Sequence, residues 1–126
     1  MATILLNSPS FVPPFYRLSQ VGWVLTFTVY YFRWIIHNYS TPFAVQILKN
    51  LVPALKPGAR IVINDHCLRE PGQENPWDEG IMRRMDMVML TLLNAQERTE
   101  EEFRELFKAA DEGFVFKVCL ICSSSS

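Results

Sequence analysis

The chain has 126 residues, a formal net charge of −1 and a hydrophobic share of 49%. That length fits a single domain, and the hydrophobic share is large enough for a core. The balanced charge removes the electrostatic attraction by which basic proteins bind nucleic acids or anionic membranes, so we expect neither partner.

The sequence also disfavours a membrane span, a secretory signal and a disulfide framework. The apolar run at 21–32 is too short to cross a bilayer, and the first residues lack the basic segment of a signal peptide, so we expect a cytoplasmic protein. The three cysteines are an odd and low number. Cys119 and Cys122 have C-x-x-C spacing, but no second pair accompanies them, and we expect no metal site.

The first two predicted segments are an arm and a strand. Residues 1–20 carry no apolar period typical of a helix or strand, prolines stand at 9, 13 and 14, and residues 21–28 lead into the strand, so we expect a poorly ordered arm over 1–28. The run at 28–36 is rich in Val, Tyr, Ile and Trp without strict alternation. That pattern predicts a strand buried on both faces.

His37 stands at the carboxyl end of this predicted strand. Ligands of open α/β sheets bind outside the carboxyl ends of the strands, so His37 is a candidate catalytic group. The alternative is a histidine that ends the strand and hydrogen-bonds a nearby carbonyl group. The residues alone leave both interpretations open.

A helix is predicted over 41–54, because apolar residues recur there at helical spacing. Pro53 is expected to distort its last turn. A second strand is predicted at 59–65, so that strand, helix and strand form a βαβ unit with parallel strands. Asp65, the last residue of this second strand, is therefore expected at the same edge of the sheet as His37.

Two further helices and a strand complete the prediction. A long helix at 78–94 bears an apolar stripe, for which core packing is the favoured interpretation and an adaptable wall of a ligand pocket the alternative. The stripe consists of Ile81, Met82, Met85, Met89 and Leu92. Thr99 and Glu102 form a capping box before a helix at 100–110, and a last strand is predicted at 114–120. The fold class is therefore α/β, with a partial, mostly parallel sheet and flanking helices.

Three blocks of the chain resemble one enzyme family. RWIIHNYS, ILKNLVPALKPGARIVIND and RRMDMVMLTLLNAQERTEEEF are similar, in order and spacing, to the C-terminal part of S-adenosylmethionine-dependent O-methyltransferases of the caffeic acid type, found in plants and fungi. The resemblance is greatest to fungal members of secondary metabolism. It implies a Rossmann-like methyltransferase domain over 29–117, with 118–126 as a tail. It also implies methyl transfer from S-adenosylmethionine to a phenolic or polyketide hydroxyl group of a small molecule.

The resemblance further implies three catalytic residues. The family's general base is the His of an H-D-W-S motif, which matches His37 in H-N-Y-S. The acidic residues that flank the base match Asp65 and Glu97. A phenol has a pKa near 10, so a neutral imidazole that takes its proton during attack on the methyl group speeds the reaction. A neighbouring carboxylate fixes the imidazole tautomer and stabilises the imidazolium.

Binding residues follow from the same resemblance. The family's cofactor contacts match Arg33 and Trp34, and residues of its phenolic pocket match Met89 and Asn94. The chain departs from the family elsewhere: its five glycines form no D-x-G-x-G-x-G turn. The helical domain through which family members form homodimers, and the last strand of the family's sheet, have no counterpart. We therefore expect this chain to bind S-adenosylmethionine weakly or not at all, and to be inactive alone.

Two other functions are weighed against methyl transfer. The first is a non-catalytic remnant that binds at most a partner or an apolar ligand, and calorimetry with S-adenosylmethionine distinguishes it. The second is a metal hydrolase that uses His37, Asp65 and His66. It is disfavoured because adjacent residues of a strand point to opposite faces of the sheet.

Overall fold

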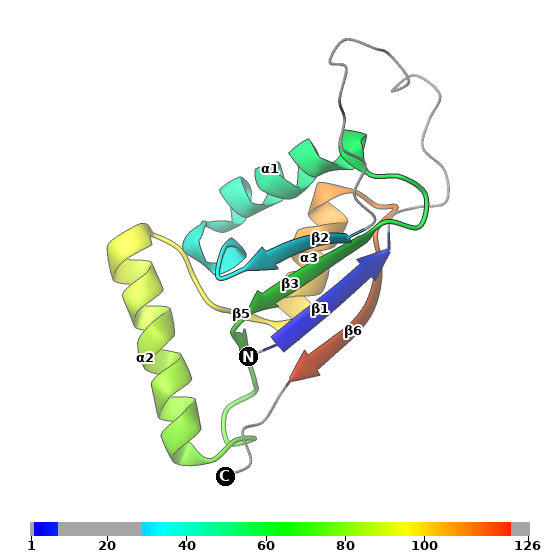
Figure 1. The fold of residues 1–126 in the computed structure, drawn as a ribbon. Helices are drawn as coiled ribbons and strands as arrows, with labels where there is room; N and C mark the ends of the chain where they lie inside the picture. Colours follow the sequence, from blue (N-terminus) through cyan, green and yellow to red (C-terminus); the bar gives the residue numbers. More distant parts are fainter. Residues whose placement is uncertain (1, 8–28, 122–126) are drawn as a thin grey trace.

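The computed structural model describes the backbone of residues 2–7 and 29–121 and the side chains of 29–117. A four-stranded sheet has the order β2(Val29–Arg33), β3(Arg60–Asp65), β1(Ala2–Asn7), β6(Val115–Ile121). Strands β2 and β3 are parallel, whereas β1 runs antiparallel to both of its neighbours (Figure 1). The three strands expected from the sequence therefore share one direction, and the predicted α/β class is confirmed.

Strand β1 corrects the expected arm for residues 2–7. It pairs along its whole length with β3, from Ala2 opposite Asp65 to Asn7 opposite Arg60, and on its other side with β6. This position supplies backbone partners to two strands at once, which outweighs the lack of a repeating apolar pattern. The rest of the expected arm lies outside the described residues.

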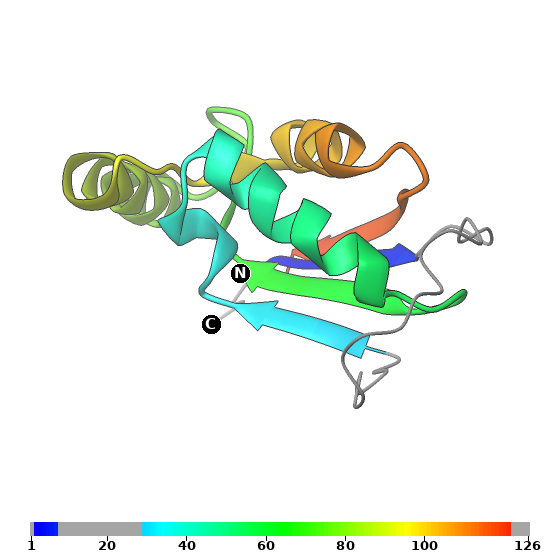
Figure 2. The ribbon, with the colours of Figure 1, turned by 90° about the horizontal axis from the view of Figure 1, so that it is seen from above.

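Helices α1(Thr41–Leu51) and α3(Glu100–Ala110) cover one face of the sheet, as Figure 2 shows. The last turn before the loop is a 3-10 turn, η3(Val52–Ala54), where Pro53 predicted a distortion. Thr99 and Glu102 form the expected capping box. The core lies between the helices and the sheet and contains twelve buried residues: Ile36, Ala44, Leu48, Leu55, Ala59, Ile61, Ile63, Cys67, Phe103, Leu106, Phe107 and Ala110.

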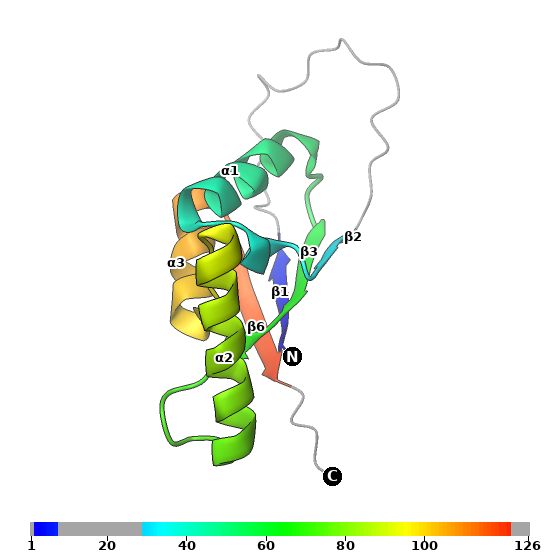
Figure 3. The ribbon, with the colours of Figure 1, turned by 90° about the vertical axis from the view of Figure 1, so that its left-hand side faces the viewer.

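Strand β2 is covered on one face only, which corrects the prediction of a strand buried on both faces. Its residues alternate between half-buried and exposed, and Tyr31 is 59% exposed. The cause is the arrangement of the layers, since helices α1 and α3 lie on the same side of the sheet (Figure 3). A continuous apolar run is therefore compatible here with a half-covered edge strand.

Helix α2(Pro76–Leu93) lies beyond the ends of β2 and β3, beside the sheet rather than over it (Figures 1 and 2). None of its residues is buried, and Leu92 is 75% exposed. The core-packing interpretation of its apolar stripe is therefore wrong. No helix in the described ranges has both the length and the apolar character that crossing a bilayer requires.

A two-stranded parallel sheet links α2 to the rest of the fold. Strand β4(Cys67–Leu68) follows β3 after one residue, and β5(Arg98–Thr99) precedes α3. Cys67 pairs with Arg98 and Leu68 with Thr99. This pairing brings the residues just before each short strand, His66 and Glu97, to the same place.

Candidate active site

His37 lies in the 3-10 turn η2(Ile36–Asn38), not directly on the end of a strand. Strand β2 ends at Arg33, three residues earlier than predicted, because Trp34 has a left-handed backbone with φ of 56°. The Asp65 carboxylate then accepts hydrogen bonds from the backbone N–H groups of Ile35 (3.3 Å) and His37 (3.0 Å). The end of β3 therefore holds the turn that carries His37.

Glu97 reaches the site from the loop between α2 and β5. Asn94 ends α2 with a left-handed backbone, and the N–H of Glu97 donates to Asp86 Oδ1 at 2.8 Å. The next residue, Arg98, is 1% exposed and donates to the carbonyl oxygens of Ile36 (3.2 Å) and Tyr39 (2.9 Å). These contacts tie the Glu97 loop to the His37 turn.

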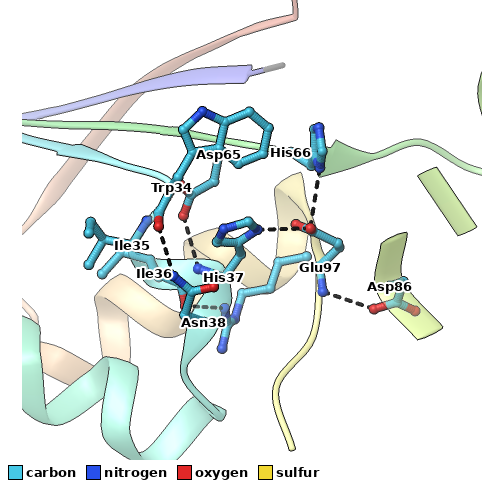
Figure 4. A network of polar contacts seen from close by, with 10 residues as sticks. Trp34, Ile35, Ile36, His37, Asn38, Asp65, His66, Asp86 and Glu97 are labelled. Carbon is cyan, nitrogen blue, oxygen red and sulfur yellow. Dashed lines mark hydrogen bonds and ion pairs between the residues drawn. The ribbon is translucent and has the colours of Figure 1, made fainter. Parts of the chain in front are cut away.

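The centre of the site is a carboxylate between two imidazoles (Figure 4). His37 Nδ1 lies 2.9 Å from Glu97 Oε1, and His66 Nδ1 lies 3.2 Å from the same oxygen. His37 and Glu97 are buried, and His66 is 9% exposed. The Trp34 ring packs against both imidazoles, with ring centroids 5.2 Å from His37 and 4.5 Å from His66.

In this cluster, neighbouring charges and burial shift the pKa values in opposite directions. Burial lowers the pKa of His37, but the hydrogen bond and charge of Glu97, with the charge of Asp65, outweigh it and raise that pKa above its ordinary value. Burial raises the pKa of Glu97, but its contacts with the two imidazoles outweigh burial and lower that pKa. Burial raises the pKa of Asp65, and this effect outweighs the lowering by the charge of His37 and by the backbone hydrogen bonds. His37 and Glu97 thus favour a charge-assisted pair.

Glu97 also lines a cavity of about 620 Å³, which neither His37 nor His66 lines. Asn94 and Glu97 both line it, together with residues from α1, α2 and α3, so the structure brings these two predicted site residues together. Met89 does not line it, although its carbonyl oxygen accepts from Ala95 N–H at 3.2 Å. Arg33 is exposed at the end of β2. The described contacts place Trp34, but not Arg33, against the imidazoles.

Three titratable groups converge at the centre of the site. Nitrogen atoms of His37 and His66 and an oxygen of Glu97 all lie within 4.8 Å of one another. The metal-hydrolase hypothesis groups the two histidines with Asp65 and is disfavoured because adjacent residues of a strand point to opposite faces. Strand β3 ends at Asp65, however, and His66 turns toward Glu97.

The site contains Arg98, for which the sequence predicts no role, and His66, which is considered only as part of a disfavoured metal hydrolase. Arg98 could have been noticed as a charged residue that directly follows a predicted site residue, but nothing in the sequence points it at the carbonyl groups of residues 36 and 39. His66 contacts Glu97 only because β4 and β5 pair. That pairing involves two residues from each strand and leaves no recognisable pattern in the sequence.

Asp65→Ala is expected to lower the free energy of unfolding by about 2 kcal/mol or more. The substitution leaves the N–H groups of Ile35 and His37 without their acceptor, and each such loss costs about 1–3 kcal/mol in a buried site. Urea unfolding measures the change. Asp111→Ala is the matched control: Asp111 accepts one described bond, from Gly113 N–H, at a half-buried position, so a smaller loss is expected. Equal losses in both variants would contradict the structural role of Asp65.

The amino-acid sequence matches the family described as the O-methyltransferase domain over residues 27–115. A chlorophenol O-methyltransferase of Trichoderma longibrachiatum is 70% identical over 89 residues, which are 71% of this chain and 19% of that protein. The chain spans about a fifth of the length of the curated relatives that it matches.

Solved structures of similar fold agree with this match. LaPhzM is similar with a TM-score of 0.58 and 32% identity, covering 66% of this chain and 24% of that one. LepI, solved in complex with S-adenosylmethionine, is similar with a TM-score of 0.57 and 30% identity, covering 66% of this chain and 20% of that one. These similarities confirm the predicted Rossmann-like form of the α/β fold.

Proposed function

The chain belongs to the O-methyltransferase domain family, and we propose that it carries the catalytic base of an enzyme that methylates a phenolic or polyketide hydroxyl group. Within the family we assign it to the caffeic acid type of plants and fungi. S-adenosylmethionine is the proposed methyl donor, because the family uses it and a structural neighbour was solved with it. The observation that carries the proposal is the 2.9 Å contact between His37 Nδ1 and Glu97 Oε1.

That contact decides which nitrogen of His37 can act as the base. A neutral imidazole carries one proton and one basic lone pair. When Nδ1–H donates to Glu97, the lone pair is on Nε2, and Nε2 can accept the proton of an acceptor hydroxyl group. Nε2 would hold this proton while the hydroxyl oxygen takes the methyl group that the bound donor would supply. Glu97 stabilises the resulting imidazolium, while Asp65 holds the turn in place.

The residues at this rim fit the methyl donor in part. Trp34 presents an aromatic surface beside His37, and Arg33 a cationic side chain at the end of β2, so these two would contact it. The donor supplies an electrophilic methyl group on a sulfonium. The acidic residues of the rim, Asp65 and Glu97, are already bonded to backbone amides and imidazoles. We therefore propose that these residues form one wall of the cofactor site, and that the chain alone binds the cofactor weakly.

A phenolic acceptor is favoured by the chemistry of the base and by a relative. An imidazole at neutral pH matches the task of removing a proton from a weakly acidic hydroxyl group. The Trichoderma protein is named for a chlorophenol substrate. We propose that the acceptor lies between His37 Nε2 and helix α2, where Met89 and Asn94 would contact it.

A chimera tests the proposed function directly. Residues 29–117 replace the matching segment of the Trichoderma chlorophenol O-methyltransferase, and methyl transfer to a panel of phenols is measured with labelled S-adenosylmethionine. The high identity of the segments favours a folded product. Methyl transfer that depends on His37 supports the proposal. A folded chimera that binds the cofactor and transfers no methyl group would support the alternative, a binding module without catalytic function.

The pH profile of the chimera gives a second test. The base acts when it is unprotonated, and the Glu97 pair raises the pKa of His37, so kcat/KM should fall as pH drops through a midpoint above the ordinary value of about 6.5. Glu97→Gln removes the negative charge and should move that midpoint to lower pH. The control Glu105→Gln changes an exposed acid of α3 and should leave the midpoint in place. Identical profiles for all three proteins would exclude Glu97 as the partner of the base.

A further inference from the structure

Glu97 Oε1 has two imidazole partners, and the proposed mechanism uses only one of them. His37 lies in the turn after β2, and His66 is the single residue between β3 and β4. The second carboxylate oxygen, Oε2, is buried and has no hydrogen-bond partner among the described residues. Both imidazoles therefore compete for one oxygen atom of one carboxylate.

We propose that His66 is a positioning residue that weakens the hold of Glu97 on the base His37 by donating Nδ1–H to the same oxygen. The proposal rests on the proposed function, in which His37 removes the acceptor proton. Its basis is geometry: Nδ1–Oε1 distances of 2.9 Å and 3.2 Å, both within hydrogen-bond range, at one buried atom.

Because two imidazoles share one acceptor oxygen, Glu97 stabilises the protonated form of His37 less strongly. Protonated His37 draws on the full charge of Glu97 only if no other donor occupies Oε1. With His66 bound there, part of that stabilisation is lost. His66 therefore makes His37 release its proton more readily between turnovers.

Other charged groups near the cluster have their own partners. Asp65, at the end of β3, binds two backbone N–H groups, and Asp86 of α2 binds the N–H of Glu97. Arg98 of β5 donates to two backbone carbonyl groups, and Glu102 of α3 binds the N–H of Thr99. In the described part of the chain, the hydrogen bonds to Glu97 Oε1 thus come from the two imidazoles.

The packing of Trp34 explains how His66 holds this position. The indole meets the His66 ring edge to face, with centroids 4.5 Å apart and an interplanar angle of 86°. The same indole touches His37 at 5.2 Å. One aromatic side chain therefore sets both imidazoles against the carboxylate. The aromatic ring of a phenylalanine at position 66 would keep this packing and lose only the donor.

The test uses the fact that the chain has two histidines. His37 is titrated by NMR with nitrogen-labelled histidine in the 126-residue chain that carries Tyr31→Lys, an exposed substitution on β2 that disfavours self-association. His66→Phe removes the donor, and His66→Asn retains an N–H donor at the same distance along the side chain. The proton affinity of His37 should rise about 2- to 10-fold in His66→Phe, the range that one hydrogen bond contributes. His66→Asn should restore part of the difference.

Two results would overturn the inference. One is an unchanged His37 titration in His66→Phe, and the other is an equal shift in both variants, which would indicate a packing effect. If His66→Phe does not fold, His66→Asn and His66→Ala are compared in the same way. The chimera distinguishes the two proposals. If His37→Ala leaves the methyl transfer rate of the chimera unchanged, His37 is not the base, whereas the NMR titration tests the shared hydrogen bond independently of that result.

Discussion

Substitution of His37 by alanine in the active chimera is expected to lower kcat by about 10²-fold or more, the usual contribution of a general base. The reason is specific to this site. His37 is buried, and its Nδ1 is bound to Glu97, so the proton of the acceptor can be taken only by the opposite nitrogen. Water cannot replace a base held at this position. Initial rates with a saturating phenol and labelled S-adenosylmethionine measure the loss.

Tyr39→Ala is the matched control for this substitution. Tyr39 lies two residues away, its side chain is 43% exposed, and the described contact with Arg98 uses only its backbone carbonyl oxygen. Its removal should change kcat by about threefold or less, since the loss of an exposed side chain seldom matters beyond about 0.5 kcal/mol. If His37→Ala retains near-normal turnover while the cofactor still binds, His37 has no role in the chemical step.

The sequence allowed good predictions wherever a local pattern determined the structure. Helix α3 begins at its predicted capping box, and the 3-10 turn at 52–54 stands where Pro53 predicted a distortion. The parallel pairing of β2 and β3 followed from the strand–helix–strand order. Each of these features depends on residues close together in the chain.

Features that depend on distant partners could not be predicted in this way. Residues 2–7 form a strand because β3 and β6 flank them, not because of their own pattern. The apolar stripe of α2 has the spacing of a core helix, yet none of its residues is buried, because the helix lies beside the sheet. Periodicity indicates which residues share a face, but not whether another element covers it.

The candidate site shows the same division between local and distant information. The family resemblance supplied His37, Asp65 and Glu97, and the structure places all three within one network. It also gives the two acids different tasks: Asp65 binds the backbone of the turn, while Glu97 binds the imidazole. His66 reaches the same Glu97 oxygen because β4 and β5 pair, and no sequence pattern predicts that pairing.

The 126-residue chain by itself should self-associate and should show no micromolar binding of S-adenosylmethionine. Within the described residues, β2 has one neighbouring strand, β3, so its other edge presents backbone donors and acceptors for pairing. Tyr31 on β2 is 59% exposed, and α2 adds exposed apolar side chains such as Leu92. Such surfaces favour association. For the cofactor, the rim offers Trp34 and an exposed Arg33, and the sequence has no D-x-G-x-G-x-G pattern.

Sedimentation and calorimetry test the two parts of this prediction separately. Tyr31→Lys places a charge on the β2 edge and should reduce the sedimenting mass, whereas Asn50→Lys adds the same charge to an exposed position of α1 and should not. Equal effects would mean that net charge, not the strand edge, controls association. Calorimetry is performed on the Tyr31→Lys protein, so that aggregation does not obscure binding. A monomeric unmodified chain would contradict the first part, and micromolar affinity for S-adenosylmethionine would contradict the second, because Trp34 and Arg33 would then suffice as a cofactor site.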